Sequence, residues 1–67
     1  MLEYIYYCLS HPPTLQNMPS DGLVYVEPYL RRQYVRNIDH LIWGVAAYDR
    51  PLSPFELDRY KLIREEV

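Results

Sequence analysis

Residues 28–48 constrain the fold of this chain more than any other segment, because they carry its longest regular apolar pattern. Apolar residues recur at positions 30, 34, 38, 41, 45 and 48, and these steps of three and four match one face of an α-helix. Pro28 suits the first turn of such a helix, where its missing N–H would have no partner. The pattern therefore predicts a long amphipathic helix over residues 28–48. Its apolar face would contain Leu30, Tyr34, Val35, Ile38, Leu41, Ile42, Val45 and Tyr48, interrupted only by Arg31.

The same segment also has features of β-strands, so a second interpretation stays open. Gly44 costs a helix about 1 kcal/mol relative to alanine. The β-branched residues lower the helix propensity further. In this alternative, residues 23–32 and 34–48 pair as long strands of a small antiparallel sheet with one C-terminal helix.

The phrase Tyr48-Asp49-Arg50-Pro51-Leu52-Ser53, with Glu56 and Leu57 after it, resembles the closing segment of laminin-G-like jelly rolls. In that family a strand ends in a similar Tyr-Asn/Asp-Arg-x-Leu-Ser phrase before a helical turn. The resemblance covers about ten residues of the chain. It implies a strand, and not a helix, ending at Tyr48.

Two segments nearer the N-terminus are predicted to be strands. Residues 2–9 and 23–27 are rich in Tyr, Ile and Val, which favour a pleated, half-buried surface. Between them, residues 10–22 hold three prolines and the turn-forming phrase Ser20-Asp21-Gly22, which together predict a loop. An antiparallel pairing of the two strands is compatible with this loop. Alternation in the first strand places Leu2, Tyr4, Tyr6 and Cys8 on one face.

The clearest helix start in the sequence lies at Ser53. Ser53 and Glu56 have the spacing of a capping box, and Pro54 occupies the first helical position between them. Leu52 and Leu57 are spaced for a hydrophobic staple across this cap. The apolar stripe then continues to the end of the chain, through Leu57, Tyr60, Ile63 and Val67.

These elements predict an α+β fold in one domain, residues 1–67, with two N-terminal strands packed on the long amphipathic helix and a short capped C-terminal helix. A chain of this length buries only about 60% of its unfolded surface, so it is marginally stable alone. One cysteine excludes an internal disulfide. Burial against a protein partner, or in a homo-oligomer, is therefore the expected source of further stability.

Residues that bind metals or perform catalysis are sparse. Cys8, His11, Asp39 and His40 are the combination closest to a zinc site or a cysteine nucleophile site. No second cysteine pair supports a zinc site. A nucleophile needs an exposed thiol in a preformed pocket, whereas Cys8 lies in a hydrophobic strand of a chain too small to build one. The two glycines are isolated, so there is no phosphate-binding loop. We therefore expect a buried structural thiol, no metal, no cofactor and no enzymatic activity.

An aromatic and basic surface is the main functional signal. On the helical interpretation, Arg32, Arg36 and Trp43 lie opposite the core-facing side, and Tyr29 lies near the arginines. Such residues dominate the hot spots of protein interfaces. They predict a small non-enzymatic interaction protein of the adaptor or inhibitor type. Its size and lack of chemistry are those of phage or mobile-element accessory proteins.

A nucleic acid is the alternative partner, through Arg31, Arg32 and Arg36 with Tyr29, because arginines contact phosphates and aromatic rings stack on unpaired bases. The electrostatic support is weak: four arginines and two aspartates give residues 31–50 a charge of +2, in a chain of charge −2. A secretory signal has basic residues before its apolar run, and the N-terminal region of this chain has none there. No apolar run approaches the ~20 residues of a membrane span, so a cytoplasmic protein without membrane contact is expected.

Overall fold

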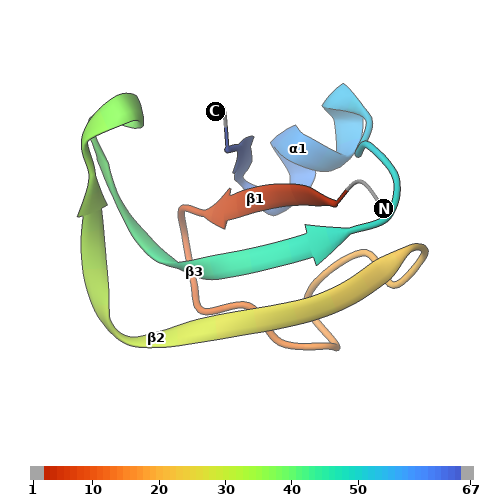
Figure 1. The fold of residues 1–67 in the computed structure, drawn as a ribbon, viewed down its shortest axis with the longest axis horizontal. Coiled ribbons are helices and arrows are strands. Elements are labelled where there is room, and N and C mark those ends of the chain that lie inside the picture. The colour runs from red at the N-terminus through yellow and green to blue at the C-terminus, as the bar shows by residue number, and fades with distance from the viewer. Residues whose placement is uncertain (1–2, 66–67) are drawn as a thin grey trace.

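In the computed structural model, which describes residues 3–65, the chain forms a four-stranded antiparallel sheet with one short α-helix (Figure 1). The strands lie in the order β2-β3-β1-β4, so β3 and β1 are central and β2 and β4 are edges. A 3-10 turn, η1, joins β2 to β3 in a hairpin. The elements are β1 (Tyr4–Cys8), β2 (Leu23–Val35), η1 (Arg36–Ile38), β3 (His40–Tyr48), α1 (Pro54–Tyr60) and β4 (Leu62–Arg64).

The predicted long helix over residues 28–48 is wrong, and with it the fold of two strands packed on such a helix. The alternative, a small antiparallel sheet with one C-terminal helix, fits the structure. β2 and β3 pair from Leu23↔Tyr48 to Val35↔His40, so the segment folds back on itself. The helical spacing predicted that Leu30, Tyr34 and Leu41 lie in the core, but all three side chains are exposed.

The composition of β3 explains why a strand forms here. β3 lies between β2 and β1, so neighbouring strands flank it on both edges. Valine, isoleucine and aromatic residues favour that environment, whereas β-branched side chains lose freedom in a helix. Every residue from 44 to 48 is buried, including both faces of the strand. Burial on both faces gives a continuous apolar run, which periodicity alone does not separate from a helix.

The predicted N-terminal strand is confirmed as β1, with Tyr6 and Cys8 buried as its alternation indicated. Leu2 lies outside the described residues. β1 pairs with β3 and β4. The antiparallel pairing of the first two strands, which the connecting loop allowed but did not require, is not formed. The predicted strand over residues 23–27 is confirmed but continues to Val35, and residues 10–22 form the predicted loop.

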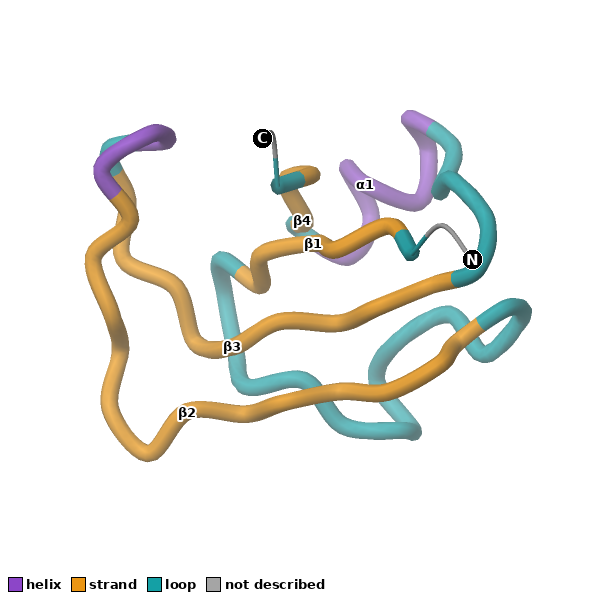
Figure 2. The backbone as a smooth tube through the Cα atoms, in the orientation of Figure 1, coloured by secondary structure: helices purple, strands orange, loops and turns teal. Residues whose placement is uncertain are grey.

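The hydrophobic core lies on one face of the sheet. The rings of Tyr6 and Tyr48 pack edge to face there, with centroids 5.9 Å apart. The Tyr48 hydroxyl donates a hydrogen bond to the Pro19 carbonyl (2.6 Å), and the Tyr6 hydroxyl accepts one from the Leu52 N–H (2.8 Å). These bonds attach to the sheet the two connections that Figure 2 draws as loops, before β2 and before α1. The other buried members of this core are Cys8, Met18, Ala46, Leu52 and Leu62.

The predicted start of the C-terminal helix is confirmed. The Ser53 hydroxyl accepts a hydrogen bond from the Glu56 N–H (3.2 Å), and the Glu56 carboxylate accepts one from the Ser53 N–H (3.0 Å). Pro54 lies in the first turn, as its fixed φ favours. The capping box therefore fixes where α1 begins.

The apolar stripe does not continue as a helix beyond Tyr60. Lys61 adopts a left-handed conformation (φ 54°), and the chain then enters β4, which pairs with β1. Leu62 is buried in the core by this pairing. Val67, the last member of the predicted stripe, lies outside the described residues.

Glu56 also joins α1 to the segment after β3. The Arg50 guanidinium donates to both carboxylate oxygens of Glu56, at 3.0 and 2.9 Å, and its Nε donates to the Asp21 carbonyl at 2.9 Å. The bonds from Arg50, followed by that from the Ser53 backbone, lower the pKa of Glu56 to about 2. The carboxylate is therefore ionised in the fold at pH values where it would be protonated in the unfolded chain.

The lowered pKa predicts how stability depends on pH. The ionised Glu56 carboxylate contributes its full stabilisation of the fold at pH values above 4.5, the pKa of this group in the unfolded chain. The stabilisation is lost as the pH falls toward about 2, the pKa in the fold. Glu56→Gln should melt below the wild type near neutral pH, and the gap should narrow across this acid range. Thermal melts of both proteins measured through that range test the expectation. A gap that stays constant with pH would mean that Glu56 does not form these bonds in solution.

Candidate functional site

The outer part of the β2–β3 hairpin, which we call the hairpin arm (residues 28–43), is the most exposed element of the fold. Pro28 pairs with Gly44, but the next pair is Gln33 with Ile42, so β2 has three more residues than β3 in this stretch. Extra residues in one strand bend the ribbon and increase its twist. Figure 1 shows the result: β2 turns sharply and the arm rises at the edge of the molecule.

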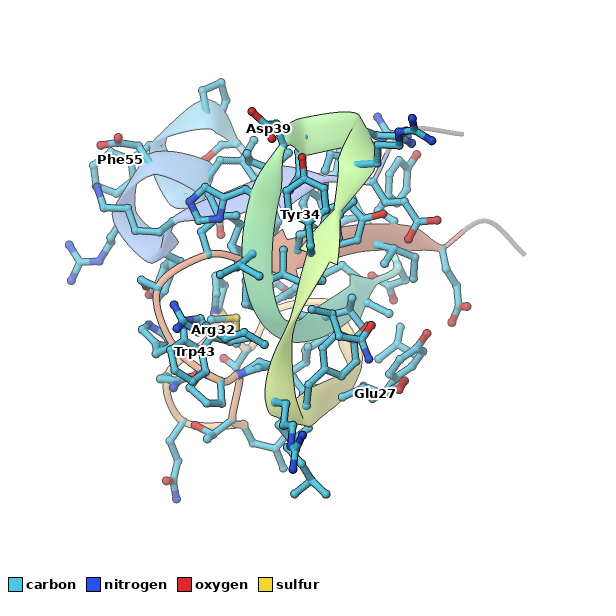
Figure 3. All side chains as sticks on the ribbon, turned by 90° about the vertical axis from the view of Figure 1, so that its left-hand side faces the viewer. Glu27, Arg32, Tyr34, Asp39, Trp43 and Phe55 are labelled. Carbon is cyan, nitrogen blue, oxygen red and sulfur yellow. The ribbon has the colours of Figure 1, made fainter. Side chains whose placement is uncertain are left out.

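Arg32 and Trp43 meet on this arm from opposite strands. The Arg32 guanidinium carbon lies 5.2 Å from the centroid of the Trp43 ring, within the range of a cation–π contact. Trp43 is half-buried, whereas Arg32 is exposed. Figure 3 shows the pair together on one side of the ribbon, with Glu27 on the other side. The contact orders two side chains of the types that carry most interface energy.

The tip of the arm is held by a second polar contact. Tyr34 donates its phenolic hydrogen to the Asp39 carboxylate. Asp39 has a left-handed conformation (φ 50°), and its N–H donates to the Arg36 carbonyl at 3.2 Å. The hydrogen bond with Asp39 raises the pKa of Tyr34. The Tyr34 ring therefore stays exposed but has a fixed orientation, as the labelled pair in Figure 3 shows.

Apolar and positively charged side chains share this arm. Leu30 is fully exposed, and Tyr34 and Leu41 are 59% and 39% exposed. Three arginines against one aspartate give the arm a charge of +2, whereas the chain as a whole carries −2. Exposed apolar residues gathered on one element, and not scattered singly, are typical of an interaction surface.

The structure brings together two of the four residues predicted to bind a partner, Arg32 and Trp43. Arg36 lies in η1 at the tip of the same arm. Tyr29 is half-buried, in an environment that includes Tyr7 and Glu65, so it does not join the Arg32–Trp43 pair. The sequence interpretation missed the other exposed members of the arm, Leu30, Tyr34 and Leu41, because the helical period assigned them to the core.

Cys8 is buried, and desolvation raises the pKa of its thiol to about 12. A thiol with so high a pKa is a poor nucleophile and a poor metal ligand near neutral pH. Within residues 3–65, no three His, Cys, Asp or Glu side chains lie close enough to hold a metal ion. The same part of the chain contains no helix with the length and apolar content needed to cross a membrane.

The fold and the arm define a small antiparallel sheet domain that extends a basic, aromatic hairpin. A family model described as "defence against restriction A C-terminal" matches residues 1–67, and the chain belongs to that family. No curated protein and no solved structure matches the chain. The family is named for defence against restriction, which indicates a phage-type accessory protein. This agrees with the phage or mobile-element accessory protein that the size and lack of chemistry predicted.

Proposed function

We propose that this chain is a non-enzymatic protein-interaction domain of an anti-restriction protein, and that its hairpin arm binds a protein partner. The observation that carries this proposal is the exposure of Leu30, Tyr34 and Leu41 on the same arm that holds the ordered Arg32–Trp43 pair. Burial of this apolar area in a complex would be favourable at ~25 cal/mol per Å². Arg32 and Trp43 would form polar contacts that orient the partner on the arm.

The composition of the arm favours a protein over a nucleic acid. Leu30 and Leu41 have apolar side chains that gain nothing from phosphates, but both would be desolvated by an apolar protein surface. The Trp43 ring is already occupied by the Arg32 guanidinium, so it is not a free platform for a base. The partner is therefore a protein whose surface combines apolar area with acidic groups.

A matched pair of variants tests the proposal. The arm variant, Leu30→Ser with Arg32→Ala, removes one exposed leucine and one arginine that lies over an aromatic ring. The control, Leu15→Ser with Arg59→Ala, makes the same changes elsewhere, since Leu15 is also exposed and Arg59 lies 5.9 Å from the centroid of Tyr60. Both variants should melt close to the wild type.

The measurement is quantitative capture of proteins from a lysate of the native host. The amount of partner captured by the arm variant should be at least about tenfold lower than that captured by the wild type, because hot-spot truncations cost ~2 kcal/mol or more of binding free energy. The control should capture the partner as the wild type does. Equal capture by the two variants would exclude the arm as the binding element.

Arg31, Arg32 and Arg36 on one arm keep a nucleic acid as the second candidate. Three phosphate contacts predict that affinity for duplex DNA falls roughly 40-fold between about 50 and about 200 mM salt. Binding to DNA with that salt dependence, lost in the arm variant, would favour this candidate. A response to salt of less than about threefold favours the protein partner.

A further inference from the structure

The face of the sheet opposite the core carries a second set of side chains that the hairpin arm does not use. Strand register and one further backbone hydrogen bond place them in two rows that run across the sheet. One row is Tyr25, Ala47, Ile5 and Glu65, where the Glu65 N–H donates to the Ile5 carbonyl. The other row is Glu27, Val45, Tyr7 and Ile63. We call these eight residues, with the adjoining Tyr29, the open face.

The open face has no covering layer within residues 3–65, because α1 and the loop before β2 pack on the other side of the sheet through Leu57 and Met18. Even so, Ala47 and Val45 are 0% and 8% exposed. Their flanking residues on β2 and β1 are much longer, and these side chains shield the small ones in the middle. The surface that meets solvent is therefore made largely of tyrosine, isoleucine and glutamate.

The tyrosines and the carboxylates of this face lie close together. Burial, and then the charge of Glu65, raise the pKa of Tyr7. Burial, followed by the charges of Glu27 and other neighbours that include Tyr7 and Glu65, raises the pKa of Tyr29. After burial, the charges of Glu27 and Glu65 are thus among the causes of these pKa shifts, and no basic side chain is.

The charge of the open face is unbalanced. Its residues include two carboxylates and, among those that the strand register places there, no lysine or arginine. Within residues 3–65, neither Glu27 nor Glu65 forms an ion pair, whereas Asp21, Glu56 and Asp58 each lie within 4.0 Å of a basic side chain. The carboxylates of this face are therefore available to an external cation.

We propose that the open face binds a lysine- or arginine-rich segment of a protein partner, separately from the hairpin arm. Charge complementarity carries this assignment, because Glu27 and Glu65 attract cations and repel acidic surfaces and nucleic acids. The tyrosine rings would hold the same cations through cation–π contacts, and the alkyl stems of lysine or arginine would pack on Ile5 and Ile63. The domain would thus join an acidic-apolar partner at its arm to a basic segment at its open face.

A peptide titration tests this proposal without knowledge of the natural partner. The probe is an eight-residue peptide that alternates arginine and alanine, added to the ¹⁵N-labelled domain at about 150 mM salt, where unspecific attraction is screened. Amide shifts should change at Ile5, Tyr7 and Ile63 and not on the hairpin arm. Glu27→Gln with Glu65→Gln should weaken binding at least tenfold.

The control is Asp49→Asn with Asp58→Asn, which removes the same charge from exposed positions outside the open face. It should bind the peptide as the wild type does. Equal weakening by the two double variants, or no shifts on the open face, would overturn the proposal. The proposal would also be overturned if the wild type self-associates and the Glu27/Glu65 variant does not. That result would mean that the open face binds the basic hairpin arm of a second copy of this chain. Failure of the host-capture experiment on the arm would leave this result unaffected.

Discussion

Replacement of Gly44 by alanine is expected to leave the chain largely unfolded near room temperature. Gly44 has a φ of 156°, and a Cβ there would lie 2.4 Å from the Glu27 carbonyl oxygen, 2.8 Å from Pro13 Cδ and 3.0 Å from Pro28 Cα. Two of these atoms belong to the backbone of the paired strand and cannot rotate away. Strain and overpacking of about 1–3 kcal/mol each would remove most of the ~3–5 kcal/mol that so small a core supplies.

The same substitution distinguishes the sheet from a helix by the sign of its effect. In a helix over residues 28–48, Gly44→Ala would stabilise the protein by about 1 kcal/mol. Far-ultraviolet circular dichroism and urea titration of the two proteins measure the change. Gly22→Ala is the comparison, since its Cβ would first meet the side chain of Asp49 (2.6 Å), which can move, so the loss should be smaller. A Gly44→Ala protein as stable as the wild type would contradict the proposed packing of β3 against β2.

The second large effect is expected at Tyr48. Tyr48→Ala should cost about 3–5 kcal/mol, because it removes a fully buried aromatic ring from the centre of the core. Tyr48→Phe keeps the ring but leaves the Pro19 carbonyl without its donor, which should cost about 1–3 kcal/mol. Urea denaturation of the three proteins separates the packing contribution from the hydrogen bond. Losses below about 1 kcal/mol for the alanine variant would place Tyr48 outside the core.

Local signals in this sequence predicted local structure well. The Ser53–Glu56 capping box fixes the start of α1 because all its hydrogen bonds lie within one turn of the chain. The alternation of residues 4–8 identified β1 and its buried face for the same reason. These features depend on neighbours in sequence, so no knowledge of the rest of the fold was needed.

Long-range pairing could not be predicted from the same signals. The helical spacing in residues 28–48 arises by coincidence, because β3 is buried on both faces while β2 is bent and largely exposed along the arm. Arg32 and Trp43 show the consequence. They are eleven residues apart, which puts them on one side of a helix, and the hairpin brings them together across two strands. The sequence analysis placed both residues on one surface, but for a helical geometry that the chain does not adopt, and it did not predict their contact.

The central claim is that residues 23–48 form a bent hairpin whose arm presents the Arg32–Trp43 pair. Nuclear Overhauser contacts measured over this segment test it most directly. The structure predicts contacts between paired residues of β2 and β3, such as Val26 with Ala46, and between the Arg32 side chain and the Trp43 ring. A ladder of contacts between residues three apart through positions 28–48, without contacts across the strands, would contradict it.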